Sequence, residues 1–162
     1  MTTTPQPRRR PRTASRVAAV QALFQSEQGP ENPEAVIDQF LRHRLGPPPD
    51  NGGFEEGRAP HADVALFQQI VRAAARQQEV IDRMIAEALP SDWPLARIDP
   101  VLRALLRAGA GELAMSEGAP ARVILNEYID IARGFFNGAE PALANAVMDR
   151  VARQLRAEEL AQ

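Results

Sequence analysis

The fold class follows from residues 121–135, which read ARVILNEYIDIARGF. The side chains of Ile124, Tyr128, Ile131 and Phe135 recur at intervals of four, three and four residues, which is the spacing of one face of an α-helix. Polar and charged residues fill most of the positions between them. This segment therefore predicts an amphipathic helix with one buried face.

The same helical spacing recurs on both sides of this segment. Apolar residues mark six further helices, at residues 17–24, 36–45, 67–74, 81–89, 102–113 and 143–155. The pattern slips at residues 76–78, where we expect a break between the third and fourth helices. Aromatic residues make up only 5% of the chain, and Ala and Leu are plentiful, which favours helices over strands. We predict an all-α protein of about seven helices.

Several classes of site are excluded by composition. The chain has no Cys, which excludes disulfides, thiolate metal sites and a Cys nucleophile. Its two histidines, His43 and His61, fall at polar positions, and Gly109 and Gly111 fall inside a predicted helix, where they indicate close helix packing and not a phosphate loop. We expect no catalytic residues, no metal site and no cofactor. No apolar run approaches the ~20 residues of a membrane span, and no secretory signal follows the basic start, so we expect a cytoplasmic protein without membrane contact.

Charge is distributed unevenly along the chain. The formal net charge is −2, but the first 16 residues carry five Arg and no acid, and the remainder carries a charge of −7. A basic arm on an acidic body predicts a polyanionic partner for the arm, and the alternative is a tail that only solubilises the protein. We assign residues 1–11 to a flexible arm, residues 12–160 to one helical domain, and residues 46–61 to a loop insertion.

Two further features are candidate sites. Phe135 and Phe136 are consecutive at a helix end and cannot both face one core, so we expect one ring to be buried and the other to be a stacking platform for a base. The alternative is that both rings pack in the corner between two helices. Arg103 and Arg107 lie four apart on one helix and form either a basic edge or a solvated face with acidic partners.

Four motifs, in this order, resemble the NusB family of bacterial transcription antitermination factors. They are the Arg cluster followed by residues 15–25 (SRVAAVQALFQ), the pairs at 98–99, 106–107 and 112–113, the helix at 121–133, and residues 143–149 (LANAVMD). The resemblance covers nearly the whole chain outside the 46–61 insertion. It implies a non-catalytic fold of two three-helix subdomains plus an extra helix. It also implies binding of the boxA element of nascent ribosomal RNA, together with the ribosomal protein NusE, which helps RNA polymerase resist termination.

The resemblance also implies roles for single residues. Phe24 stands where the family usually has Tyr, Arg133 takes a Lys position, and Glu112 matches an acidic position that holds the ribosomal protein. The residues expected at the RNA are Arg8, Arg9, Arg10, Arg12, Arg16, Phe24, Arg107, Arg133, Phe135 and Asn145. The chain departs from the family pattern at three positions, which are Gly111, Leu143 and Ala146.

The partners that follow are boxA-type RNA, NusE and the antitermination complex of RNA polymerase. A homodimer is left open. The competing hypothesis is a helical protein–protein interaction module, self-associating or not, whose Arg tail only solubilises it.

Overall fold

The computed structural model describes residues 10–46 and 58–161. Within these ranges the chain forms eight helices: α1 (Pro11–Gln28), α2 (Pro33–His43), α3 (Val64–Arg76), α4 (Gln78–Ala88), α5 (Pro100–Ala114), α6 (Ala121–Phe135), α7 (Glu140–Leu155) and α8 (Ala157–Leu160). The predicted all-α class is confirmed. Seven of the helices are those expected from the sequence, and α8 is a single turn that the apolar pattern did not indicate.

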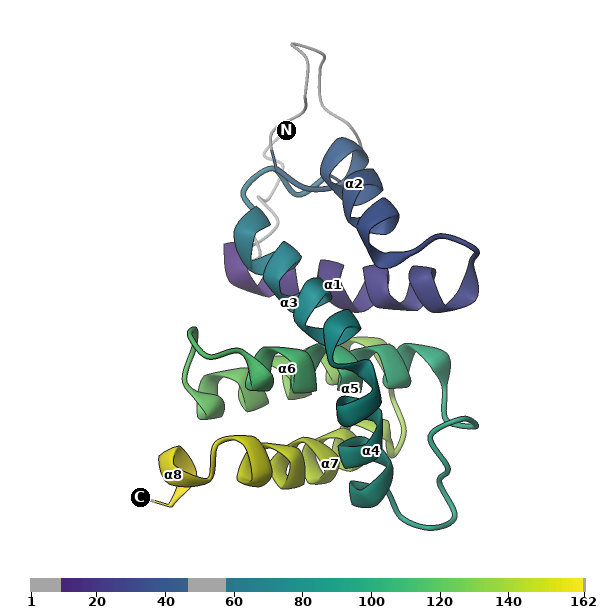
Figure 1. Ribbon diagram of the computed structural model, residues 1–162, viewed down its shortest axis with the longest axis vertical. Coiled ribbons are helices and arrows are strands. Elements are labelled where there is room, and N and C mark those ends of the chain that lie inside the picture. Colours follow the sequence, from purple (N-terminus) through teal and green to yellow (C-terminus); the bar gives the residue numbers. More distant parts are fainter. Residues whose placement is uncertain (1–9, 47–57, 162) are drawn as a thin grey trace, which may run out of the picture.

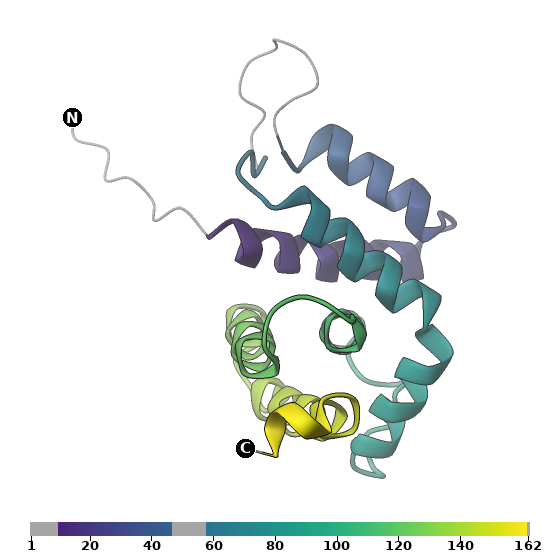
Figure 2. The same cartoon turned by 60° about the vertical axis from the view of Figure 1, so that its left-hand side comes forward.

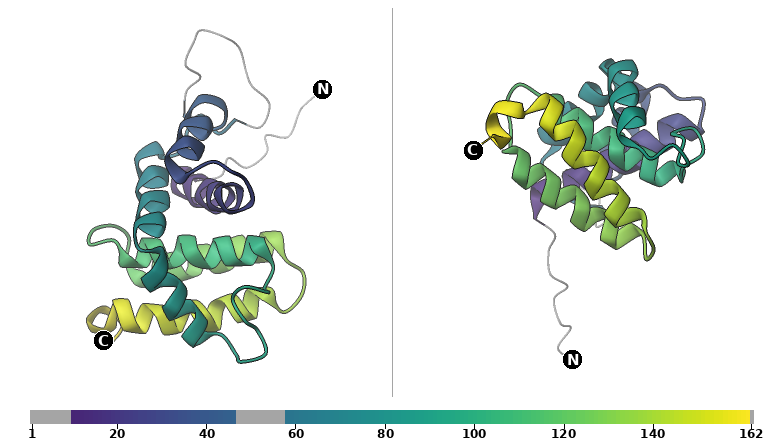
Figure 3. Two further views of the ribbon diagram at one scale, coloured as in Figure 1. Left: turned by 45° about the vertical axis from the view of Figure 1, so that its right-hand side comes forward. Right: turned by 90° about the horizontal axis from the view of Figure 1, so that it is seen from below.

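The helices form two groups (Figures 1 and 2). The first group is α1, α2 and α3, and the second is α5, α6 and α7 with α4 beside it. Helix α4 follows α3 almost end to end, so the two together connect the groups (Figure 3). Helix α5 lies at the centre, where it packs against α1, α3, α4, α6 and α7. This arrangement agrees with two three-helix subdomains plus an extra helix.

The central position of α5 follows from its sequence. Asp99 caps its first turn by accepting hydrogen bonds from the backbone N–H groups of Val101 (2.7 Å) and Leu102 (3.3 Å), and Pro100 occupies the favoured first position. A Cβ atom at Gly111 would lie 2.9 Å from the Cβ of Ala74 on α3. The glycine therefore allows α3 to approach the backbone of α5 closely, as the sequence predicted.

The predicted break between the third and fourth helices is also confirmed. Gln77 separates α3 from α4 with φ −112° and ψ 23°, outside helical geometry. The backbone N–H of Gln77 still donates to the carbonyl of Ala73 at 3.2 Å. Gln77 is therefore the single non-helical residue between α3 and α4. The chain bends there without a loop, and α4 packs in the second group.

The expected insertion at 46–61 is held at both ends. The N–H of Gly46 donates to the carbonyl of Ala59 at 3.1 Å, and the N–H of Ala59 donates to the carbonyl of Arg44 at 2.8 Å. Arg58 is 8% exposed and donates to the carbonyls of Arg42 and Gly46, both at 2.8 Å. Gly46, Arg58 and Ala59 therefore belong to the packed fold, whereas Pro60 and His61 are exposed. Residues 47–57 of the insertion lie outside the described residues, as do residues 1–9 of the arm.

In the described part of the chain, no helix is long and apolar enough to cross a membrane.

Candidate nucleic-acid interface

Arg16, which we expected at the RNA, is inside the protein. The residue is 1% exposed, and so is Glu112. The Nε of Arg16 donates to Oε1 of Glu112 at 2.8 Å, and its Nη2 donates to Oε2 at 2.8 Å, which is the bidentate geometry that Arg and a carboxylate prefer. The expected surface placement of both residues is therefore wrong. Arg16 and Glu112 bind each other in the core, and neither side chain faces solvent.

A wider network surrounds this pair. The hydroxyl of Tyr128 donates to Oε1 of Glu112 at 3.1 Å, Nη1 of Arg16 lies 3.5 Å from Oε1 of Glu127, and Oγ1 of Thr13 donates to Oε2 of Glu127 at 3.0 Å. Burial and the nearby charge of Glu112 raise the pKa of Tyr128 well above 10. Burial alone would lower the pKa of Arg16, but the hydrogen bond and charge of Glu112 outweigh it and raise that pKa. The network joins α1 to α5 and α6, and so fixes the first turns of α1.

Arg103 and Arg107 form a second network with acidic side chains. The guanidinium of Arg107 donates to both carboxyl oxygens of Asp82, at 2.8 and 2.9 Å, and to Glu27 at 3.0 Å. The hydrogen bond to Asp82 raises the pKa of Arg107. Arg103 also pairs with Glu27. Of the two interpretations of this helix face, the one with acidic partners is observed, so the placement of Arg107 at an open basic edge is wrong.

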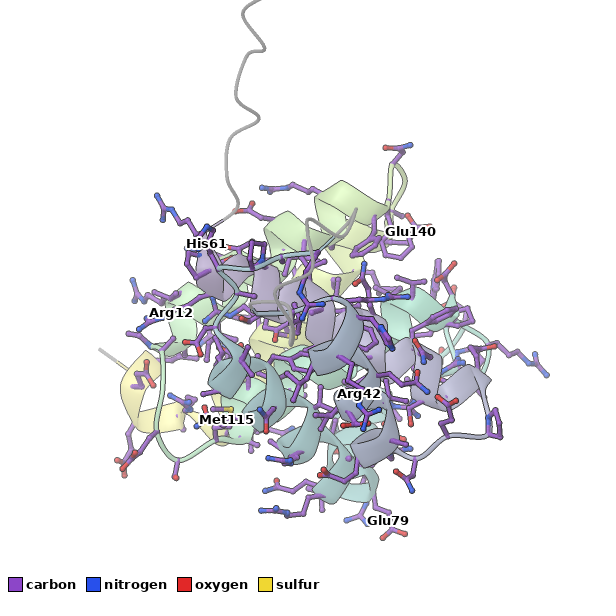
Figure 4. All side chains as sticks on the ribbon, turned by 90° about the horizontal axis from the view of Figure 1, so that it is seen from above. Arg12, Arg42, His61, Glu79, Met115 and Glu140 are labelled. Carbon is purple, nitrogen blue, oxygen red and sulfur yellow. The ribbon has the colours of Figure 1, made fainter. Side chains whose placement is uncertain are left out.

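Arg10 and Arg12 are exposed cations at the start of the described chain. Both are exposed at the start of α1, and Figure 4 shows Arg12 at the periphery of the body. Within the described residues, neither has a carboxylate oxygen within 4.0 Å. The first turn of α1 contains no acid and its N-cap makes no side-chain hydrogen bond, so the positive end of the helix adds to these two charges. Arg8 and Arg9 lie outside the described residues.

The two consecutive phenylalanines have different surroundings. Phe135 ends α6 and is 42% exposed, whereas Phe136 is partly buried and packs against the core. Their ring centroids are 6.4 Å apart at an interplanar angle of 52°. Of the two interpretations, the one with one inward and one outward ring is observed. The apolar spacing that placed Phe135 on the buried face of this helix is wrong at that residue, because the helix ends there and the ring extends beyond the packed part of α6. Phe135 has the exposure that stacking on a base requires.

Two hollows flank the exposed ring of Phe135. The first, which we name the Phe24 hollow, has a volume of about 520 Å³. Its described lining residues are Val20, Gln21, Phe24, Gln25, Gln28, Gly29, Arg44, Val101 and Phe135. The second, the Thr13 hollow, has a volume of about 310 Å³ and is lined by Thr13, Val17, Gln21, Asp130, Ile131, Gly134 and Phe135. Gln21 and Phe135 line both hollows, so the two lie next to each other along the outer face of α1.

Two other expected RNA contacts are exposed but are not among the described lining residues of either hollow. Arg133 is exposed on α6 and its Nη1 donates to Oδ1 of Asp130 at 3.2 Å. This pair is solvent-exposed and therefore weak, so it can open to a phosphate. Asn145 is exposed on α7. No group of three or more His, Asp or Glu side chains that could hold a metal ion occurs among residues 10–46 and 58–161.

Some members of this surface were not predicted from the sequence. Gln21, Gln25 and Gln28 line the Phe24 hollow, and their spacing of four and three residues places them on one face of α1. That spacing was a usable signal. Arg44 also lines this hollow, but it comes from the segment after α2, and no local pattern in the sequence connects it with α1.

These features define a class of protein, a helical adaptor that presents exposed cations and an aromatic ring on one surface, as proteins that bind single-stranded nucleic acid do. The model of the NusB family matches residues 13–153. The chain belongs to the NusB family. This membership confirms the expected class, a non-enzymatic transcription antitermination factor.

Relatives and solved structures agree with this assignment. The chain is 64% identical to transcription antitermination protein NusB of Granulibacter bethesdensis over 95% of this chain and 94% of the relative. It is 49% identical to the protein of that name from Gluconobacter oxydans, over 91% and 90%. A solved structure of T. maritima NusB superposes with a TM-score of 0.72 at 24% identity, covering 98% of this chain and 100% of that one.

A second solved structure with this fold is the crystal structure of antitermination factors NusB and NusE in complex with dsRNA. It superposes with a TM-score of 0.67 at 18% identity, over 88% of this chain and 96% of that one. At these identities, both structural matches show the common fold.

Proposed function

We propose that this chain binds boxA-type single-stranded RNA of nascent ribosomal transcripts together with the ribosomal protein NusE, and so helps RNA polymerase resist termination in the cytoplasm. The main support for this proposal is the set of side chains on the outer face of α1. There, Arg10 and Arg12, which have no carboxylate partner among residues 10–46 and 58–161, precede the exposed ring of Phe135 and the hollows beside it. The crystal structure of a NusB with NusE and dsRNA supports RNA and NusE as the partners of this chain.

The arm supplies affinity that depends on charge. An Arg that neutralises a phosphate releases condensed counterions, so binding weakens as salt increases. Arg10 and Arg12, with Arg8 and Arg9 before them in the chain, can each contact a phosphate. Arg16 does not take part, because its guanidinium is engaged by Glu112 inside the protein. Its role is to hold α1 in place, which positions the arm.

The ring surface selects single-stranded RNA over a duplex. Only an unstacked base can lie on an aromatic side chain, and each such contact is worth about 1–3 kcal/mol. Phe135 offers its ring directly, and Phe24 offers the part of its ring that lines the Phe24 hollow. The amide of Gln21, which borders both hollows, can donate to and accept from a base edge.

Glu112 has a different task from the one its family position implied. Its side chain is 1% exposed and is therefore not available to a partner at the surface. The acidic charge that attracts a basic ribosomal protein therefore comes from exposed Asp and Glu side chains of the body, which carries the −7 charge of the sequence after residue 16.

The test is a fluorescence anisotropy titration with a labelled boxA-like single-stranded RNA, with and without NusE, at several salt concentrations. We expect binding that tightens with NusE, weakens for a scrambled RNA, and weakens with salt. Replacing Arg8, Arg9, Arg10 and Arg12 together by Gln is expected to reduce the slope of log K against log salt by about 0.7 for each phosphate that is no longer neutralised.

Two results would contradict the proposal. One is the absence of RNA binding at low salt, and the other is equal affinity for the scrambled RNA when NusE is present. Sedimentation of the same samples tests the homodimer. A dimer that forms and does not dissociate when RNA is added would favour the competing self-associating module.

A further inference from the structure

The Phe24 hollow has a positive charge that does not come from the arm. Arg44 lies directly after α2 and lines the hollow opposite residues of α1 and α6. Among the described lining residues there is no Asp or Glu. The Thr13 hollow differs in this respect, because Asp130 lines it. Of the two hollows beside Phe135, the Phe24 hollow is therefore the one that favours an anion.

The position of Arg44 is fixed by its neighbours. Its backbone N–H donates to the carbonyl of Phe40 at 2.8 Å, and its own carbonyl accepts from the N–H of Ala59 at 2.8 Å. The guanidinium carbon lies 4.7 Å from the centroid of the Phe40 ring. That ring is 1% exposed and is stacked on Phe67 at 5.5 Å. A buried ring under the guanidinium limits its freedom through a cation–π contact.

No carboxylate of the described residues engages the N–H groups of Arg44. Within the described residues, no Asp or Glu oxygen lies within 4.0 Å of its guanidinium, although the residue is exposed. Two other arginines, on α2 and α3, differ, because Arg42 pairs with Asp38 at 3.0 Å and Arg72 pairs with Glu34 at 2.8 Å. Arg44 therefore combines a fixed position with donors that remain available to an external anion.

We propose that Arg44 is a second phosphate-binding residue for the RNA, separate from the arm. A nucleotide whose base stacks on Phe135 and fills the Phe24 hollow places a neighbouring phosphate at this guanidinium. The strand then crosses α1 toward the end of α2 and avoids the hollow that contains Asp130. The inference rests on the proposed RNA-binding function and adds the direction of the strand across α1.

The experiment compares Arg44→Gln with Arg42→Gln in the full chain, using the labelled boxA-like RNA and a series of salt concentrations. Arg42 is a matched control because it is an exposed Arg near the same helix end but is not among the described lining residues of the Phe24 hollow. We expect Arg44→Gln to reduce the slope of log K against log salt by about 0.7. The factor by which affinity falls between 50 and 200 mM salt is then about 2.6-fold smaller for the variant than for the wild type. We expect Arg42→Gln to leave the slope unchanged.

A further variant separates charge from structure. Arg44→Lys keeps the charge and is expected to keep the wild-type slope, and circular dichroism of each variant reports whether the fold is retained. The proposal is overturned if the wild type binds and Arg44→Gln behaves like Arg42→Gln, or if Arg44→Lys loses the slope as fully as Arg44→Gln while folded. Absence of RNA binding by the wild type overturns the proposed function and this inference with it.

Discussion

The first turn of α1 and the turn that follows it have opposite surroundings. Arg12 is exposed and has no carboxylate partner within the described residues, whereas Arg16, four residues later on the same side of the helix, is 1% exposed and bound by Glu112. Residues four apart lie on one side of a helix. Their surroundings differ, because Arg16 meets Glu112 of α5 and Glu127 of α6, whereas Arg12 has no carboxylate oxygen within 4.0 Å among residues 10–46 and 58–161. The presence of a buried carboxylate partner, and not the helix side, separates the interior Arg from the exposed one.

The buried network of Arg16 and Glu112 and the open face of α1 have different physical roles. The buried network gains little net stability over an apolar core of the same volume, but removal of one partner leaves an uncompensated charge. The open face contributes little to folding, and its charges and ring are available for a ligand. Variants in the first region should therefore change stability, and variants in the second should change affinity and its dependence on salt.

The largest expected effect is on the buried network. Glu112→Gln removes the bidentate charge partner of buried Arg16 and leaves only the more distant Glu127, and we expect the free energy of unfolding to fall by about 3–5 kcal/mol. Urea unfolding followed by circular dichroism measures this change. The control is Glu34→Gln, which removes the exposed pair with Arg72 and should leave the midpoint unchanged. Equal midpoints for the two variants would show that the buried pair is not structural.

Close packing between α3 and α5 gives the next effect. A Cβ at Gly111 would lie 2.9–3.0 Å from atoms of Ala74, including its backbone N and Cα, so Gly111→Ala forces two helices apart and is expected to destabilise the protein by about 1–3 kcal/mol. Gly134→Ala is the matched control, since nothing lies within 4 Å of its Cβ position. It should stabilise α6 by at most ~1 kcal/mol. Thermal unfolding of both variants tests the pair, and a stable Gly111→Ala variant would contradict the packing account.

The open face is tested by the exposed ring. Phe135→Ala should weaken RNA binding by about 1–3 kcal/mol, or roughly 5- to 150-fold, because base stacking on the ring is removed. The melting temperature should change little, because the ring is 42% exposed. Val123→Ala, at a residue of the same helix that is 44% exposed, should change neither quantity. If Phe135→Ala bound RNA as the wild type does, the ring would have no part in the interface.

The smallest effect concerns alkaline pH. Folding raises the pKa of Tyr128, because burial and Glu112 disfavour its ionised form. The unfolded chain therefore loses this proton first, so stability is retained below about pH 10 and falls as pH rises above that value. Tyr128→Phe should cost about 1 kcal/mol at neutral pH because the hydrogen bond to Glu112 is removed, and it should lack this alkaline contribution. Urea midpoints between pH 8 and 11 measure it, and an equally steep alkaline decrease in the variant would contradict it.

Local features of the fold could be predicted from the sequence. The apolar spacing indicated the helices, and the slip at residues 76–78 indicated the break at Gln77. The two glycines of α5 indicated its close packing, and the consecutive rings indicated that one of Phe135 and Phe136 faces outward, although not which of them. Each of these signals lies within one or two helical turns, where side-chain periodicity is informative.

The ion pairs that remove Arg16 and Arg107 from the expected RNA surface could not be predicted from such local signals. Arg16 and Glu112 are 96 positions apart, and Arg107 is 80 positions from Glu27. An Arg in a basic cluster and a Glu in an apolar helix look like surface groups until the tertiary fold brings them together. The contribution of Arg44 to the Phe24 hollow depends on the packing of α2 beside α1, which no local pattern encodes.

The separation of surface and interior arginines is tested most directly by the salt dependence of RNA binding in two variants. One carries Arg10→Gln and Arg12→Gln. The other replaces the buried network with apolar side chains, as Arg16→Met, Glu112→Leu and Tyr128→Phe, a type of exchange that buried ion pairs often tolerate. We predict that the first variant reduces the slope of log K against log salt by about 1.4 and that the second keeps the wild-type slope. A wild-type slope in the first variant with a reduced slope in the folded second variant would contradict the account.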